Sequence, residues 1–302
     1  MERRQQQFYA LGSQAYITLI AETTFDFEQE FAALHSVIAS FEQRFSRFLP
    51  DSELTKFNEN AGSKTEISLE FRKLLLACKN MSETTDDFYN PFVLPALQKA
   101  GYRGSWPSPA NLADAKDFSD RKVVPSAELT IYEGTAIIPA GTALDFGGIG
   151  KGYLLDDLNA LLQPFELHGY WLSLGGDIVC AGGDLENEWA VQVQAATGPE
   201  EAVTILTNHT GTPTFIATSG ITKRRGDTEK GSWHHIIDPK TGTPAQTDIL
   251  TATVTSGSGV EADIYAKTIV IAGSSEAKNL KDAGHIRSYI LQYEDKEPTI
   301  EL

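Results

Sequence analysis

Residues 142–162 read TALDFGGIGKGYLLDDLNALL, a short apolar stretch that passes through closely spaced glycines into a leucine-rich segment. The pattern predicts a strand, a tight glycine turn and an amphipathic helix. Glycines let a backbone approach a ligand, a helix N-terminus offers free N–H groups, and Lys151 adds a positive charge. The segment therefore fits a phosphate-binding loop, or simply a strand-to-helix turn in which Asp145 caps the helix. Its spacing matches neither the Rossmann fingerprint nor the Walker A loop.

The residues on either side of this segment predict helices and strands in mixed order. Apolar residues at steps of three and four predict a helix over residues 26–45 with Asp26 as its N-cap, a helix opened by Ser68, and a helix over residues 260–272. Enrichment in β-branched and aromatic residues predicts strands at 15–21, 171–181, 189–194, 214–217, 250–255 and 288–293. We therefore expect an α+β fold.

The composition is that of a folded chain. Of the 302 residues, 41% are hydrophobic and 22% are charged, which excludes disorder as the dominant state. Residues 102–126 are rich in Pro, Ser, Asn and Asp and predict a long surface excursion. We expect residues 1–302 to form one domain that carries this excursion.

Charge and targeting signals restrict the partners. Lys and Arg number 25 against 41 Asp and Glu, a net charge of −16 that disfavours nucleic acid and anionic membrane surfaces. Cys78 and Cys180 lie in apolar contexts and predict buried thiols rather than a disulfide or a zinc site. We see no signal peptide and no membrane-spanning segment, and we expect a cytoplasmic protein, a trimmed exported form being the alternative.

Three further segments carry side chains suited to binding or catalysis, and each has a plainer interpretation. WHHIIDPKTGT, at 233–243, offers a histidine general base, or a solvated histidine pair beside a β-turn. ATSGITKRR, at 217–225, fits a polyanionic ligand, or is a basic loop. FSRFLPDSELTKFN, at 45–58, can stack on a planar heterocycle, or is a helix exit followed by a helix capped by Asp51 or Ser52.

Asp263 and Lys267 lie four residues apart within an apolar segment and share one helix face. At a surface such a spacing gives an ordinary ion pair, worth only about 0.2 to 0.5 kcal/mol. The apolar neighbours predict instead that the pair is partly buried. Partial burial favours a second interpretation, in which Asp263 is a hard oxygen ligand for Mg²⁺.

In their order along the chain, these segments resemble the ApbE-type FAD:protein FMN transferases. The resemblance covers about residues 8–273 and rests on FSRFLPDSELTKFN, NPFVLPAL, ALDFGGIGKGY, LSLGGDIVCAG, ATSG, HHIIDPKTG and the Ala-Asp helix at Ala262. It implies a single α+β domain, T-fold-like, with mixed or antiparallel sheets and packed helices. It also implies an enzyme that binds FAD and Mg²⁺, moves FMN onto a Thr or Ser hydroxyl of an acceptor flavoprotein, and releases AMP.

The resemblance implies roles for individual residues. His235 is the candidate base, and Asp238 lies in the turn that follows it. The backbone carbonyl of Gly148 and the carboxylate of Asp263 would reach the metal. The residues that would contact FAD are Phe48, Phe88, Tyr89, Asn90, Asp145, Lys151, Thr218, Ser219 and Ile236.

The sequence departs from the family pattern at three positions. Asn90 stands where the family usually has Asp, and Phe92 where it usually has Thr. The metal-binding helix is normally Ala-Asp-x-x-x-Thr, and its Thr position is Lys267 here, a cation that would compete with Mg²⁺ for Asp263. Two alternatives to a transferase therefore stay open: an FAD pyrophosphatase that yields FMN and AMP, and a flavin-binding module without catalysis.

Overall fold

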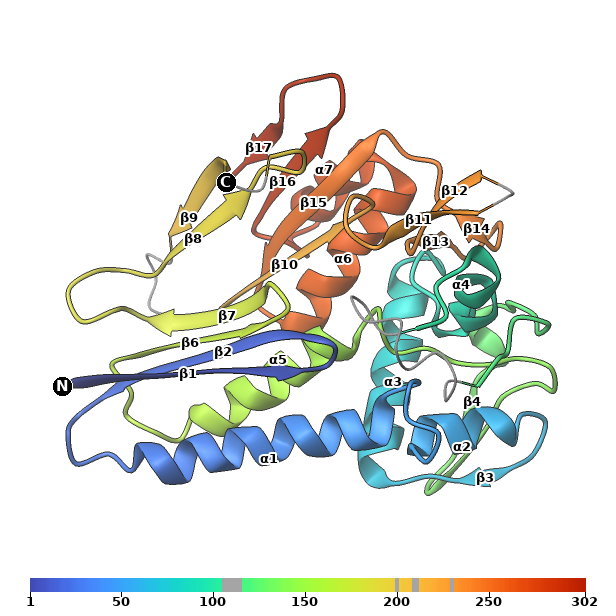
Figure 1. Ribbon diagram of the computed structural model, residues 1–302, viewed down its shortest axis with the longest axis horizontal. Helices are drawn as coiled ribbons and strands as arrows, with labels where there is room; N and C mark the ends of the chain where they lie inside the picture. The colour runs from blue at the N-terminus through green and yellow to red at the C-terminus, as the bar shows by residue number, and fades with distance from the viewer. Residues whose placement is uncertain (105–115, 199–200, 208–211, 229–230) are drawn as a thin grey trace.

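An antiparallel sheet forms the centre of the molecule (Figure 1). The computed structural model describes residues 1–104, 116–198, 201–207, 212–228 and 231–302. Within these ranges the sheet order is β1-β2-β6-β7-β10-β15-β16-β17, and neighbouring strands are antiparallel. The strands are β1 (Glu2–Ala10), β2 (Ser13–Ala21), β6 (Gly169–Leu174), β7 (Asp177–Gly182), β10 (Thr214–Gly220), β15 (Ile249–Ser256), β16 (Ser288–Tyr293) and β17 (Thr299–Glu301).

Helices α1 (Phe27–Phe45), α5 (Gly150–Leu162) and α6 (Gly259–Ala272) cover one face of this sheet, and α7 (Ser274–Asp282) follows α6 (Figure 1). The apolar stripe of α1, including Leu34 and Ile38, is fully buried with the leucines of α5. Asp26 caps α1 by accepting a hydrogen bond from the backbone N–H of Gln29 at 3.0 Å. The helix predicted over 26–45 is thus confirmed, and so is the one predicted over 260–272.

The opposite face of the sheet is covered by the hairpin of β8 (Ala190–Gln194) and β9 (Ala202–Thr207). Val191 and Val193 of β8 are buried against Ile178 and Ile216, while the alternate residues of the strand are exposed. The neighbouring residues of β10, Phe215 and Ala217, belong to the core on the helical face. The sheet is therefore buried on both faces at this point, and residues 215–217 of β10 are three consecutive buried apolar residues.

A second group of elements lies beyond the C-terminal end of α1 (Figure 1). Its helix α3 is capped by Ser68, as predicted, and α2 is capped by Ser52, one of the two predicted caps. The rings of Phe45, Phe57, Phe71 and Phe146 are in mutual edge or stacking contact and join the group to α1 and to the loop before α5. The elements are α2 (Glu53–Glu59), β3 (Thr65–Glu66), α3 (Leu69–Thr84), η1 (Pro91–Val93), α4 (Leu94–Ala100), η3 (Ser126–Glu128), β4 (Thr130–Ile131), β5 (Thr135–Ile137), β11 (Arg225–Thr228), β12 (Gly231–His234), β13 (Ile237–Asp238) and β14 (Thr243–Pro244).

The structure corrects two predictions. The strand predicted over 171–181 is the hairpin β6–β7, which turns at Gly175 and Gly176 with φ of 63° and 98°. Two consecutive positive φ values favour glycine, and Gly-Gly is a common hairpin turn. Asp145 does not cap α5, because it lies in the preceding loop and accepts a hydrogen bond from Gly147 N–H at 3.0 Å.

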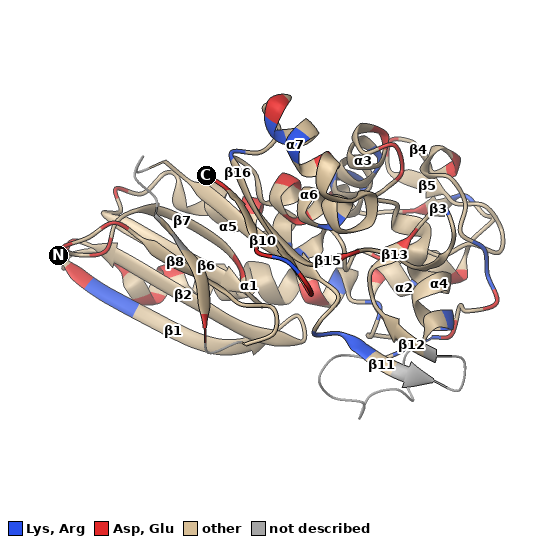
Figure 2. Ribbon diagram, turned by 90° about the horizontal axis from the view of Figure 1, so that it is seen from above, with Lys and Arg blue, Asp and Glu red and all other residues tan. Residues whose placement is uncertain are grey.

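Other expectations have mixed outcomes. The α+β class is confirmed, and Cys78 and Cys180 are both buried thiols. Residues 105–115 of the predicted excursion lie outside the described residues, so the excursion and the one-domain organisation stay predictions. Within the described ranges, no helix combines the length and apolar character that a bilayer crossing requires. Figure 2 shows acidic positions on many elements, so the net charge of −16 is not concentrated on one of them.

Candidate active site

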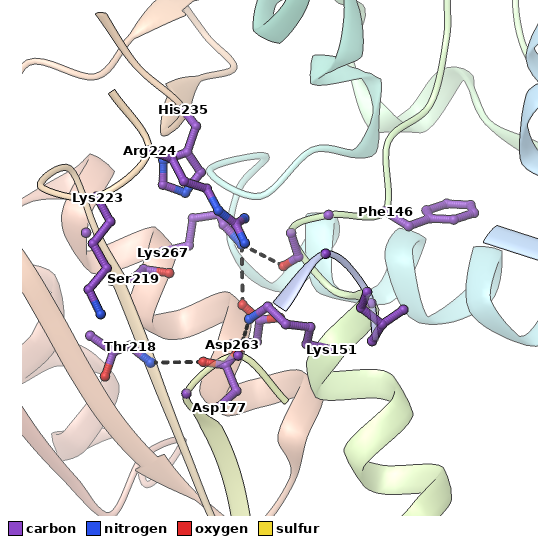
Figure 3. Close-up of a pocket in the computed structure, with 18 of the residues that line it drawn as sticks. Phe146, Lys151, Asp177, Thr218, Ser219, Lys223, Arg224, His235, Asp263 and Lys267 are labelled. Carbon is purple, nitrogen blue, oxygen red and sulfur yellow. Dashed lines mark hydrogen bonds and ion pairs between the residues drawn. The ribbon is translucent and has the colours of Figure 1, made fainter. Parts of the chain in front are cut away.

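A cavity of about 820 Å³ lies where the sheet, the β8 strand, the loop before α5 and the second group of elements meet. Its lining runs along the chain from Tyr9 to Ile271, and the β8 strand closes part of its rim. The structure brings together in its walls most of the predicted site residues: Phe48, Phe88, Tyr89, Asn90, Asp145, Gly148, Lys151, Thr218, Ser219, His235, Asp263 and Lys267. Figure 3 shows several of these side chains directed toward the same space.

The loop before α5 is held by a buried ion pair. Asp145 Oδ1 lies 3.1 Å from Arg47 Nε, and the two side chains are 7% and 6% exposed. The Arg47 guanidinium in turn lies over the rings of Phe48, at 4.3 Å, and Tyr102, at 4.9 Å. Asp145 therefore fixes an arginine and two aromatic rings in one wall of the cavity.

Lys151 begins the first turn of α5 and forms an ion pair with Asp177, at the start of β7. The second carboxylate oxygen of Asp177 accepts a hydrogen bond from the backbone N–H of Thr218 at 3.3 Å, which ties the pair to β10 (Figure 3). Burial lowers the pKa of Lys151 to about 8, with Asp263 raising it and Arg224 and Lys267 lowering it. The Lys151 ammonium is thus a partly desolvated charge beside the glycine turn.

Helices α5 and α6 touch through their backbones. A Cβ atom on Gly152 would overlap the carbonyl of Gly259, and one on Gly259 would overlap the carbonyl of Gly152. The Asp156 carboxylate on α5 accepts hydrogen bonds from Gly259 N–H at 2.7 Å and Val260 N–H at 3.0 Å, at the start of α6. A carboxylate at a helix N-terminus is favoured by the free N–H groups and the helix dipole. The start of α6 is therefore fixed against α5.

This contact places Asp263 and Lys267, further along α6, beside the glycine turn. Asp263 Oδ2 accepts a hydrogen bond from Gly152 N–H at 3.4 Å, and Asp263 Oδ1 lies 3.5 Å from Lys267 Nζ. Lys267 Nζ also donates to the Gly148 carbonyl at 2.7 Å. The side chains of Asp263 and Lys267 are 5% and 18% exposed, so the predicted burial of the pair is confirmed.

These contacts do not suit a magnesium ion. Within the described residues, no group of three or more His, Cys, Asp or Glu side chains could hold a metal. The two oxygens expected to ligate it, on Gly148 and Asp263, instead face the Lys267 ammonium. Mg²⁺ requires near-octahedral oxygen ligation, and a lysine has no acceptor to contribute. The residues present therefore do not fit the metal that the resemblance implies.

His235 follows β12, and its backbone N–H donates to the Arg224 carbonyl at 3.0 Å. Within the described ranges, its buried Nδ1 atom has no hydrogen-bond partner. Burial, and then the charges of Arg224 and Lys267, lower the pKa of His235 well below the ordinary value of 6.5. The imidazole is consequently neutral near pH 7 and can accept a proton.

Two of the predicted site residues do not line the cavity. Ile236 is 1% exposed and belongs to the main core. Asp238 lies in the β13–β14 turn, where its carboxylate accepts a hydrogen bond from the backbone N–H of Lys240 at 2.9 Å. Asp238 thus shapes the turn that follows His235, without reaching the cavity.

The side chain of Asn90 is held by hydrogen bonds to backbone groups of other residues. Its Nδ2 donates to the Val124 carbonyl at 2.9 Å, and its Oδ1 accepts from the Phe92 N–H at 2.9 Å. An aspartate could not make the first of these bonds, because a carboxylate has no N–H to donate. Phe92 is fully buried, so both departures from the family pattern in this segment have a structural role in this chain.

Arg47, Tyr102 and Asp177 also line the cavity and were not predicted from the sequence. Arg47 lay inside the quoted segment at 45–58 and Asp177 inside LSLGGDIVCAG. A Gly-Gly hairpin turn followed directly by Asp was the available signal for Asp177.

A model of the ApbE family matches residues 11–290. The chain belongs to the ApbE family. It is 23% identical over 276 residues to the FAD:protein FMN transferase of Haemophilus influenzae, covering 87% of this chain and 78% of that one. The FAD:protein FMN transferase of Treponema pallidum is 28% identical over 263 residues, 80% of this chain and 72% of that one.

Solved ApbE structures share the fold. The ApbE protein of Thermotoga maritima matches with a TM-score of 0.85 at 21% identity, covering 99% of this chain and 97% of that chain. The apo flavinyl transferase ApbE of Pseudomonas stutzeri matches with a TM-score of 0.82 at 19% identity, over 99% and 95% of the two chains. The ApbE resemblance and the ApbE-like fold predicted from the sequence are both confirmed.

Proposed function

We propose that this ApbE-family chain transfers the FMN moiety of FAD to a Thr or Ser hydroxyl of an acceptor flavoprotein and releases AMP. The observation that carries the proposal is that the half-buried imidazole of His235 lines the same cavity as the glycine turn, Lys151 and Lys267. Relatives that bear the name FAD:protein FMN transferase support it.

The cavity suits the parts of FAD. Its volume of about 820 Å³ lies within the range usual for a cofactor-sized ligand. Phe48, Phe88 and Tyr89 offer aromatic faces for a flat ring system. The N-terminal end of the α5 dipole and the Lys151 ammonium offer positive charge for a pyrophosphate beside the glycine turn. Thr218 and Ser219 of β10 add hydroxyl groups to the lining.

The reaction that we assign exchanges the phosphoanhydride bond of FAD for a phosphoester bond to the acceptor. The acceptor oxygen forms a bond to the FMN-side phosphorus, and the bond from that phosphorus to the AMP oxygen breaks. The hydroxyl proton moves to His235, and AMP leaves with the bonding electron pair. Phosphoryl transfer depends mainly on positioning and charge neutralisation, so the Lys151 ammonium and the N-terminal end of the α5 dipole supply much of the acceleration. Magnesium has no part in this assignment.

The test incubates the protein with FAD, with and without a candidate acceptor protein, and measures AMP and in-gel flavin fluorescence of the acceptor. We expect AMP together with a fluorescent acceptor. AMP without a fluorescent acceptor would identify an FAD pyrophosphatase instead. Neither product would leave a flavin-binding module and contradict the proposal.

The pKa of His235 sets the expected pH dependence. A general base works in its deprotonated form, and burial keeps the folded-state pKa of His235 well below 6.5. Lowering the pH from about 7.5 to about 6.5 should therefore leave the single-turnover transfer rate unchanged, and the rate should fall only at lower pH. A rate that falls with a midpoint at or above about 6.5, while FAD stays bound, would contradict His235 as the base.

A further inference from the structure

We propose that the ammonium of Lys267 takes the place of a divalent cation in this chain. It would be a cation supplied by the protein for the pyrophosphate of FAD, so that FAD binding does not require Mg²⁺. This inference rests on the proposed function only in taking FAD as the ligand.

The position of Lys267 Nζ is the first argument. The atom lies 2.7 Å from the Gly148 carbonyl and 3.5 Å from Asp263 Oδ1, between two oxygens that could otherwise bind a cation. An ammonium has three N–H donors. These two oxygens face two of them, and the side chain, which is 18% exposed, lines the cavity. The third donor is therefore available to an oxygen of a ligand, such as a phosphate oxygen.

The fit of the surrounding backbone is the second argument. A Cβ atom on Gly148 would lie 2.9 Å from Lys267 Nζ and 3.3 Å from a ring carbon of Tyr89, so a larger residue at this position would displace the ammonium from where it lies. The helix that carries Lys267 cannot shift easily, because Gly152 and Gly259 are in backbone contact. The ammonium is consequently pre-positioned before a ligand arrives.

Charge is the third argument. A magnesium ion at Asp263 would lie within a few ångströms of a partly buried ammonium, and two like charges at that distance repel strongly outside bulk water. Mg²⁺ and the Lys267 ammonium therefore do not occupy the site beside Asp263 together. The Lys267 ammonium carries one positive charge, whereas Mg²⁺ carries two. Lys151 and Arg224 line the same cavity and add further positive charge (Figure 3).

The first measurement uses the unmodified protein. Calorimetric titration with FAD is carried out in EDTA and again in Mg²⁺, and the FAD-free protein is titrated with Mg²⁺. We expect FAD dissociation constants that agree within about twofold, and no saturable heat from Mg²⁺. An FAD affinity that falls about tenfold or more in EDTA, or tight Mg²⁺ binding to the free protein, would overturn the inference.

Variants at one position locate the effect. In EDTA, Lys267→Met should weaken FAD binding about ten- to a hundredfold, the usual loss for a hydrogen bond to a charged group. Lys267→Thr should show the same loss in EDTA and recover about tenfold or more in Mg²⁺, because a hydroxyl restores an oxygen ligand. The matched control is Lys296→Met, which removes another lysine paired with an aspartate, Asp248 at 2.8 Å, away from the cavity.

FAD affinities of both Lys267 variants that equal the wild-type value in EDTA would refute the inference. Thermal unfolding establishes that each variant is folded, and if one is not, the wild-type titrations decide alone. These titrations measure binding and not transfer. Loss of the proposed transferase activity in the product assay would therefore leave this inference intact. Failure to bind FAD both in EDTA and in Mg²⁺ would refute it.

Discussion

Replacing His235 with alanine is expected to slow FMN transfer by about 10²- to 10⁴-fold while FAD affinity stays within a few-fold. A general base acts on the proton that moves during the reaction, and it contributes little to binding the ground state. The imidazole suits this role because its Nδ1 atom has no hydrogen-bond partner within the described ranges and its pKa is lowered well below 6.5. Single-turnover rates and calorimetric titration with FAD measure the two quantities separately.

The neighbouring histidine is the matched control for this experiment. His234 Nε2 is within hydrogen-bond distance, 3.0 Å, of the Ala245 carbonyl, and His234 does not line the cavity. His234→Ala should therefore change the transfer rate much less than His235→Ala. If the two substitutions slow transfer equally, or if His235→Ala abolishes FAD binding in parallel, His235 is a structural or ligand-contact residue and not the base.

Gly152→Ala is expected to lower the free energy of unfolding by about 3 kcal/mol or more, because the added methyl group would overlap the Gly259 carbonyl. Neither helix can yield cheaply, since both are buried in the main core and Asp156 ties the start of α6 to α5. Urea unfolding followed by circular dichroism measures the loss.

Gly150→Ala, two residues earlier on α5, is the control for this effect. A Cβ atom there would meet carbons of the Phe41 ring at 3.4 Å, which is ordinary contact, and alanine favours helix more than glycine does. Its unfolding free energy should match or exceed that of the wild type. If both variants lost similar stability, the close approach of α5 and α6 would not be the cause.

The helices were predictable because their information is local. Apolar residues at helical spacing and a capping side chain, such as Asp26 or Ser68, lie within one segment and determine where α1 and α3 begin. The edge strand β1 was not predicted, because an edge strand exposes one side to water and its sequence, ERRQQQFYA, is mostly polar. The β6–β7 hairpin was read as one strand because the turn at Gly175 and Gly176 was not recognised.

The site was predictable as a set of segments but not as a set of contacts. Gly147, Gly148 and Gly150 of the glycine turn lie in the lining of one cavity together with His235 and Asp263, while their roles stay predictions. The ion pairs Arg47–Asp145 and Lys151–Asp177 join residues far apart in the sequence, and no local pattern indicates them. The contact between Lys267 and the Gly148 carbonyl likewise depends on how α5 and α6 pack. Tertiary packing therefore supplied what spacing alone could not.

The residues that line the cavity are spread along the chain from Tyr9 to Ile271. Binding of a ligand therefore affects the stability of the whole folded protein. A site assembled from so much of the sequence does not exist in the unfolded chain, so a ligand bound there stabilises only the folded state. At a free concentration one hundred times its dissociation constant, such a ligand adds about 2.7 kcal/mol to the free energy of unfolding. With FAD as the proposed ligand, a shortage of flavin would raise the unfolded fraction of the protein, which is the form that proteases degrade.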